Sequence, residues 1–153
     1  MVSLTEGDAA PEIDLLDESG RRFRLSGLRG RKVVLYFYPR ANTPGCTVEA
    51  CEFRDRAVEF GGRNAAIVGV SPDKPAAQLK FKTGKSLPFT LLADVDRSAA
   101  EAYGVWKEKN MYGKKVMGIE RTTFVIGEDG RIERGFRKVK AAGHAAQVLE
   151  SIR

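Results

Sequence analysis

Short apolar runs alternate along the chain with amphipathic segments, and polar turns separate them. The run from Val33 to Tyr38 is continuous and rich in β-branched and aromatic residues, which predicts a strand buried on both faces. The run from Ala65 to Val70 predicts a second buried strand, and Leu87 to Leu92 a short third one. Strands of this kind are typical of the centre of an α/β sheet.

Helices are predicted between and after these strands. Thr43-Pro44-Gly45 introduces a helix from about Cys46 to Phe60, and Gly61-Gly62 ends it. Asp96 is the expected N-cap of a helix that runs to Tyr103. Two further helices are expected over Pro75 to Gly84 and over Gly143 to Ile152.

Two hairpins complete the pattern, one near each end of the chain. The first joins residues 13–16 to residues 21–25 across Asp17-Glu18-Ser19-Gly20, and the second joins residues 122–126 to residues 131–136 across Gly127-Glu128-Asp129-Gly130. Strands that alternate with helices and end in a hairpin predict an α/β sandwich around a mixed sheet. We therefore expect one domain over residues 1–153.

Composition narrows the class of protein. Apolar residues make up 42% and charged residues 30% of the chain, as in ordinary soluble proteins, and no apolar run approaches the length of a membrane span. The first eight residues lack the basic start and apolar core of a signal peptide, so we expect a cytoplasmic location. The net charge of +6 raises the alternative of nucleic-acid binding, but the cations are dispersed and no nucleic-acid-binding motif accompanies them.

The two cysteines, Cys46 and Cys51, lie five positions apart in one predicted helix. At that spacing their Cα atoms are roughly 8.6 Å apart and their side chains about 140° apart around the axis. Because a disulfide needs Cα atoms within about 7 Å, the pair can be reduced inside the helix, but its oxidation must unwind the helix. In a reducing compartment such a pair is more typical of redox chemistry than of a structural crosslink.

Cys46 is expected at the junction of a central strand and a helix, where α/β sheets place their sites. A helix N-terminus favours the thiolate, Thr43 can direct its hydroxyl to the same point, and Pro39 and Pro44 stiffen the loop. Arg121 is a candidate cation beside the thiolate. Cys51 could instead be a small core residue. Zinc fits poorly, because the two cysteines and the single histidine do not supply four ligands.

The chain resembles a known family over almost its whole length. Pro39-x-x-x-Thr43-x-x-Cys46 matches the active-site motif of the peroxiredoxins. The run Asn42-Thr43-Pro44-Gly45-Cys46-Thr47 with Glu49-Ala50-Cys51 is similar to the peroxiredoxin Q subfamily, also called bacterioferritin comigratory proteins. Later segments share the likeness, among them Gly118-Ile119-x-Arg121-Thr122-Thr123-Phe124. The resemblance implies a thioredoxin-like fold and a thiol-dependent peroxidase that needs no metal or organic cofactor.

By this resemblance Cys46 is the peroxidatic cysteine, which a hydroperoxide oxidises to a sulfenic acid, and Cys51 is the resolving cysteine of an intramolecular disulfide. Thr43 would hold the peroxide, Arg121 would stabilise the thiolate and the transition state, and Pro39 would exclude water. Glu49 resembles the glutamate that orients the arginine, although it could also be a solvated surface acid. Thioredoxin, or alternatively glutaredoxin, would reduce the disulfide. Members of this subfamily are often monomers, so we expect a monomer.

Some alternatives stay open on the sequence alone. The same cysteine chemistry would serve a peroxide sensor that passes oxidation to a client protein. His144 is expected to be a helix cap or a surface residue. Trp106, Met111 and Tyr112 could line the entrance for an organic hydroperoxide or could cover the core beneath a long loop.

Overall fold

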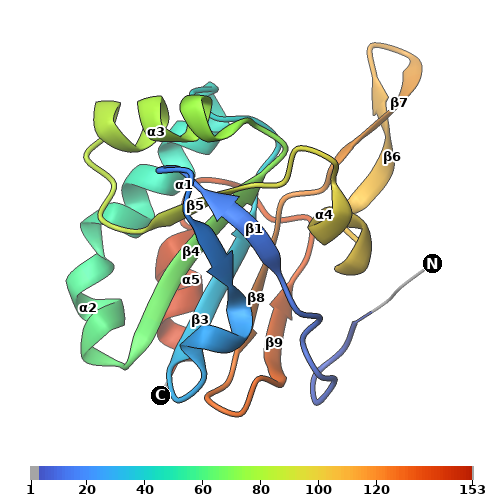
Figure 1. The fold of residues 1–153 in the computed structure, drawn as a ribbon. Helices are drawn as coiled ribbons and strands as arrows, with labels where there is room; N and C mark the ends of the chain where they lie inside the picture. Colours follow the sequence, from blue (N-terminus) through green and yellow to red (C-terminus); the bar gives the residue numbers. More distant parts are fainter. Residues whose placement is uncertain (1–3, 153) are drawn as a thin grey trace.

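The computed structural model describes residues 4–152 and has a central seven-stranded mixed sheet (Figure 1). Its strand order is β2-β1-β5-β4-β3-β8-β9. The three central strands β3, β4 and β5 are parallel, and the flanking pairs are antiparallel. The strand bounds are β1 Asp14–Asp17, β2 Arg22–Arg24, β3 Lys32–Phe37, β4 Ala65–Ser71, β5 Thr90–Ala93, β8 Thr122–Ile126 and β9 Ile132–Phe136. This arrangement confirms the mixed α/β fold and the N-terminal hairpin.

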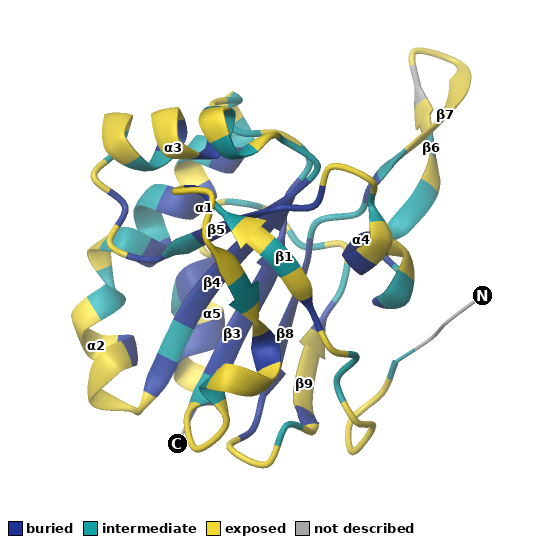
Figure 2. Cartoon of the chain, in the orientation of Figure 1, coloured by how far each residue is buried: buried dark blue, intermediate teal, exposed yellow. Residues whose placement is uncertain are grey.

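Apolar clusters cover both faces of the sheet, and alternate residues of β3 point into each of them. Val34, Tyr36 and Tyr38 face a cluster that includes residues of α1, α2, α3 and α5. Residues 33, 35 and 37 face a second cluster with α4 and the segment around Ile13. The helix bounds are α1 Pro44–Asp55, α2 Ala57–Gly62, α3 Pro75–Gly84, α4 Ser98–Ala102 and α5 His144–Ser151, with a short 3-10 helix at Leu25–Leu28. Figure 2 shows the resulting buried central strands.

The predicted single helix over residues 46–60 is wrong, because the chain forms α1 and α2 with a break at Arg56. The Arg56 guanidinium donates a hydrogen bond to the carbonyl of Glu52 (3.4 Å). In a continuous helix this carbonyl would accept the backbone N–H of Arg56. That N–H donates instead to Phe53 (3.2 Å). The break lets α2 take a new direction while Phe60 stays fully buried.

Two boundaries also differ from the sequence prediction. Helix α4 starts at Ser98, and its first N–H groups at Ala99 and Ala100 donate to Asp94 (3.0 and 2.8 Å). Asp94 therefore satisfies the helix start, whereas Asp96 accepts a hydrogen bond from the N–H of Ser98. The third central strand is β5 at Thr90–Ala93, later than the run from residue 87 predicts.

The sequence analysis missed a second, two-stranded sheet that projects from the molecule (Figure 1). It consists of β6 (Trp106–Met111) and β7 (Lys114–Ile119), joined by a two-residue turn. The turn residues Tyr112 and Gly113 both have positive φ angles (52° and 79°), as a tight hairpin turn requires. The strands carry many lysines and little alternating apolar pattern, so the hairpin signal is weak in the sequence.

Candidate functional site

The loop after β3 and the first turn of α1 hold the predicted nucleophile. Thr43 is the N-cap of α1 in an extended conformation, and Pro44 occupies the first helical position. Cys46 follows in the first turn, with its side chain 1% exposed. The free N–H groups and the dipole of this helix end favour negative charge at that position.

Arg121 joins the site from the segment between β7 and β8. Its Nη2 donates a hydrogen bond to Cys46 Sγ at 3.4 Å, and its Nη1 donates to Glu49 Oε1 at 2.6 Å. The structure therefore shows the two contacts that the sequence analysis expected, one between Arg121 and the sulfur of Cys46 and one between Arg121 and Glu49. A planar guanidinium can make both contacts at once because its donors form a fixed fork.

Gly45 is part of this arrangement, in a role that the sequence analysis did not assign to it. A Cβ atom at this position would lie 3.2 Å from Arg121 Nη2, closer than most such contacts. The absence of a side chain therefore leaves room for the guanidinium beside Cys46. The only sequence signal was a glycine inside the first helical turn, where alanine would favour the helix more.

Glu49 is fully buried, so its interpretation as a surface acid is wrong. Burial raises the pKa of Glu49 to about 7, although Arg121 opposes the shift. Its second oxygen, Oε2, has no hydrogen-bond partner among residues 4–152. Burial alone would lower the pKa of Arg121, but Glu49 and Cys46 raise it above its ordinary value. The arginine is therefore held in its charged form.

Thr43 and Pro39 lie on either side of a short turn. The Thr43 hydroxyl donates to the carbonyl of Arg40 at 2.8 Å and does not cap the helix. Its oxygen keeps its acceptor capacity for another group. Pro39 is half-buried and lines a cleft of about 630 Å³ that also reaches Arg121.

The β6–β7 hairpin supplies much of the lining of this cleft. Lys107, Lys109 and Asn110 come from β6, and Lys138 comes from the loop after β9. Burial lowers the pKa of Lys109, and the charge of Arg121 lowers it further. Glu108 and Glu120 line the same cleft, so its lining carries four cations against two acids, and part of that lining comes from an element that the sequence analysis did not predict.

Cys51 lies later in α1, half-buried, and both cysteines are free thiols. Helix α1 is unbroken from residue 44 to residue 55, so it contains both cysteines in one regular helix. This is the geometry in which their spacing excludes a disulfide. The structure therefore corresponds to the reduced form.

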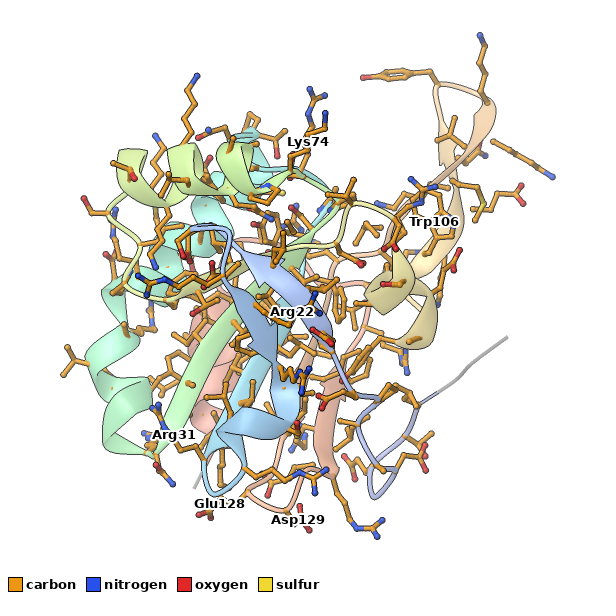
Figure 3. The ribbon with its side chains drawn as sticks, in the orientation of Figure 1. Arg22, Arg31, Lys74, Trp106, Glu128 and Asp129 are labelled. Atoms are coloured by element: carbon orange, nitrogen blue, oxygen red, sulfur yellow. The ribbon has the colours of Figure 1, made fainter. Side chains whose placement is uncertain are left out.

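The structure also shows where the residues lie whose interpretation the sequence left open. His144 begins α5 as expected, but it is buried, with its Nε2 2.6 Å from Thr123 Oγ1, so the surface interpretation is wrong. Burial lowers its pKa. Trp106 is half-buried at the base of the hairpin (Figure 3), and the guanidinium of Arg97 lies over its ring, whereas Tyr112 is 98% exposed. The side chain of Met111 lies outside the described part of the structure.

The described residues form neither a metal-binding cluster nor a membrane-spanning helix. Across residues 4–152, no group of three or more His, Cys, Asp or Glu side chains is placed to hold a metal ion. Within the same range, every helix is too short or too polar to span a membrane.

Residues 6–134 match the AhpC/TSA family. Peroxiredoxin Bcp of Bacillus subtilis is 46% identical over 147 residues, which cover 96% of this chain and 94% of that protein. Among solved structures, a mutant of peroxiredoxin Q from Xylella fastidiosa has a TM-score of 0.93 at 36% identity, covering 99% and 96% of the two chains. The bacterioferritin comigratory protein of Xanthomonas campestris has a TM-score of 0.88 at 39% identity, covering 94% and 96%. The chain belongs to the AhpC/TSA family, in the group of Bcp and peroxiredoxin Q proteins.

Proposed function

We propose that this protein reduces hydroperoxides with Cys46 as the peroxidatic and Cys51 as the resolving cysteine. The observation that carries the proposal is the Arg121 hydrogen bond to Cys46 Sγ at the start of α1. A guanidinium and a helix N-terminus both stabilise a thiolate, which is the reactive form of the thiol. The related protein of X. campestris has an alkyl peroxide reduction activity, which supports the same class of substrate here.

The first step is attack of the Cys46 thiolate on the terminal oxygen of the hydroperoxide. The S–O bond forms as the O–O bond breaks, and the leaving alkoxide takes a proton and departs as an alcohol, or as water from hydrogen peroxide. Arg121 stabilises the charge that spreads over the breaking bond. Thr43 accepts a hydrogen bond from the hydroperoxide, and Pro39 limits access of water.

The second step resolves the sulfenic acid. The sulfur of Cys51 attacks Cys46 Sγ, water leaves, and an intramolecular disulfide forms. Since the two cysteines occupy one helix, this step unwinds the first turns of α1. A dithiol partner then restores both thiols through a mixed disulfide.

We infer that thioredoxin is the physiological dithiol, with glutaredoxin as the alternative, and that the chain acts as a cytoplasmic monomer of one domain. The intramolecular position of Cys51 supports the monomer, because no second copy is needed to resolve Cys46. Comparing turnover with thioredoxin and with glutaredoxin, and measuring the molar mass in solution, tests these points.

Mass spectrometry after one equivalent of peroxide tests the chemistry. We expect the loss of two hydrogens, mapped to a peptide that links Cys46 and Cys51. The Cys46→Ser variant should lose peroxidase activity. The Cys51→Ser variant should consume peroxide once and lose recycling by thioredoxin, and full recycling in that variant would contradict the resolving role.

A further inference from the structure

A chain of buried hydrogen bonds runs beneath the loop that connects β3 to α1. It starts at Gln78 on α3, which is completely buried. The Tyr38 hydroxyl donates to Gln78 Oε1 at 2.5 Å. Gln78 Nε2 donates to Ser71 Oγ at 2.7 Å and to the carbonyl of Leu92 at 2.8 Å. Gln78 therefore connects the ends of three neighbouring strands, β3, β4 and β5.

The chain continues from β4 to the loop through Asp73. Ser71 Oγ donates to Asp73 Oδ2 at 2.5 Å, and the same oxygen accepts the backbone N–H of Ala41 at 2.7 Å. Ala41 lies in the middle of the loop between Pro39 and Thr43. A side chain that follows β4 thus fixes the backbone of the segment that follows β3. Figure 3 labels Lys74, the residue after Asp73, at the start of α3.

This contact is needed because the loop is otherwise held by few regular interactions. Residues 39–43 belong to no strand or helix, and Asn42 has a positive φ of 60°. Asparagine adopts this left-handed conformation more readily than other residues with a side chain, so the residue suits the turn, and the hydrogen bonds around it set the position of the loop. The hydrogen bond to Asp73 immediately precedes Asn42, and the Thr43 hydroxyl bond to Arg40 closes the turn.

We propose that Asp73 is a positioning residue for peroxide reduction. It accepts the Ala41 N–H and, supported by Ser71 and Gln78, holds Pro39 and Thr43 in place against the thiol of Cys46. This inference rests on the proposed function, and it adds a residue that contacts neither the sulfur nor Arg121. Small displacements of groups around a reacting centre reduce rates strongly, because a near-attack geometry is lost.

The test compares Asp73→Ala with Asp73→Asn. Asparagine keeps a carbonyl oxygen that can accept from both Ala41 and Ser71, whereas alanine removes the acceptor. We expect Asp73→Ala to slow oxidation of Cys46 by one equivalent of peroxide by about tenfold or more, and Asp73→Asn to stay within about threefold of the unmodified protein. The rate is followed by rapid quenching and mass spectrometry.

Alkylation of Cys46 by iodoacetamide separates positioning from general loosening of the fold. This reaction reports the thiolate and its access but does not need a bound peroxide. A positioning role predicts that the alkylation rate of Asp73→Ala changes by less than about twofold while its peroxide rate falls. Parallel changes in both rates, or an unchanged peroxide rate, would overturn the proposal. Glu59→Ala, a substitution at an exposed position of α2, is the control and should change neither the alkylation rate nor the peroxide rate.

A second variant keeps the proposal testable if Asp73→Ala does not fold. Ser71→Ala leaves the Asp73 bond to Ala41 but removes the link to Gln78. It should slow peroxide oxidation by about twofold to fivefold relative to the unmodified protein, and a rate equal to that of the unmodified protein would contradict the role of this chain of hydrogen bonds. Failure of the proposed function itself is distinguishable, because then the unmodified protein would not react with peroxide.

Discussion

Around Cys46, each contact has a separate electrostatic or steric role. Arg121 donates to the sulfur and to Glu49 with different nitrogens, and Gly45 leaves the space that this guanidinium occupies. Glu49 is an acid in a fully buried position, where the charged form is unfavourable unless a cation compensates it. These properties lead to two predictions about single residues.

The first concerns Gly45→Ala. The new Cβ would lie 3.2 Å from Arg121 Nη2, so the guanidinium must shift by a few tenths of an ångström. We expect the peroxide reaction to slow by about threefold to tenfold, while the free energy of unfolding stays the same or rises by up to about 1 kcal/mol, because alanine favours the helix. Gly61→Ala in α2, where a Cβ meets nothing within 4 Å, is the matched control and should leave the peroxide rate unchanged. Equal rates for the two variants would show that the Gly45 contact is unimportant.

The second concerns the pH dependence of stability through Glu49. The pKa of this group is about 7 in the folded protein against 4.5 ordinarily, so between these values the folded state binds more protons than the unfolded state. Stability from this group is therefore greatest below pH 4.5 and is lost as the pH rises toward 7, by about 3 kcal/mol in total. We expect the difference in unfolding free energy between the unmodified protein and Glu49→Gln to fall over this range. Urea unfolding at several pH values measures it, and a difference that rises with pH would contradict the assigned direction.

Helix α1 is held differently at its two ends. Its first turns contact Arg121 through Cys46 and Glu49. Further along, Glu52 Oε1 accepts the N–H of Gly143 at 2.9 Å, at the start of α5, and Arg54 donates to the carbonyl of Lys85 at 2.9 Å. The second half of the helix is thus fixed to α5 and to the end of α3.

We therefore predict that disulfide formation unwinds only part of α1. Hydrogen exchange of the oxidised protein should accelerate most over residues 45–51 and change less from Phe53 onward, because Phe53 is fully buried and its ring stacks on that of Tyr36 with centroids 4.8 Å apart. In Glu52→Ala the accelerated region should extend toward Arg56, since the contact with Gly143 is lost. Fast exchange throughout residues 45–60 in the unmodified oxidised protein would show that the second half is not held. Glu59→Ala is again the control, and in this variant the accelerated region should be the same as in the unmodified protein.

At the scale of the whole molecule, the candidate site and the last turn of α5 lie at opposite ends of the central strands. Cys46 follows the carboxyl end of β3, whereas Arg63 lies just before the start of the parallel strand β4. Arg63 Nη1 donates to the carbonyl of Ile152 at 2.8 Å and also to that of Leu149, at the end of α5. A cation there satisfies free carbonyls and complements the helix dipole.

We predict that Arg63→Ala lowers the free energy of unfolding by about 1–3 kcal/mol, because a charge-assisted hydrogen bond to a helix end is lost. The peroxide rate should be unchanged, since the site at the other end of β3 keeps its contacts. Urea unfolding and single-turnover oxidation measure the two effects. Lys80→Ala, an exposed cation on α3, is the control and should change neither quantity. A slower peroxide reaction in Arg63→Ala would show that the two ends are coupled.

The sequence alone determined the order in which the central strands and helices follow one another along the chain. It also determined the placement of Cys46 at the start of a helix. These features depend on apolar periodicity and on the local chemistry of Pro44 and the glycines, which act over a few residues. The spacing of Cys46 and Cys51 likewise follows from helix geometry, whatever the surroundings. Arg121 was named as a candidate cation before the family resemblance was considered, whereas its contacts with Cys46 and Glu49 were expected from the resemblance and not from a local pattern.

Only the tertiary structure decided which of these groups meet. Arg121 lies 75 positions from Cys46 in the chain, and Asp73 lies 32 positions from Ala41. No local pattern encodes such distances, because the sheet order brings the segments together. The β6–β7 hairpin and the break at Arg56 were missed for related reasons: the hairpin has a weak apolar pattern, and a side chain competes for one helical carbonyl. The sequence thus specified two thiols that a helix keeps apart, and the fold supplied the cation, the space at Gly45 and the support of the loop.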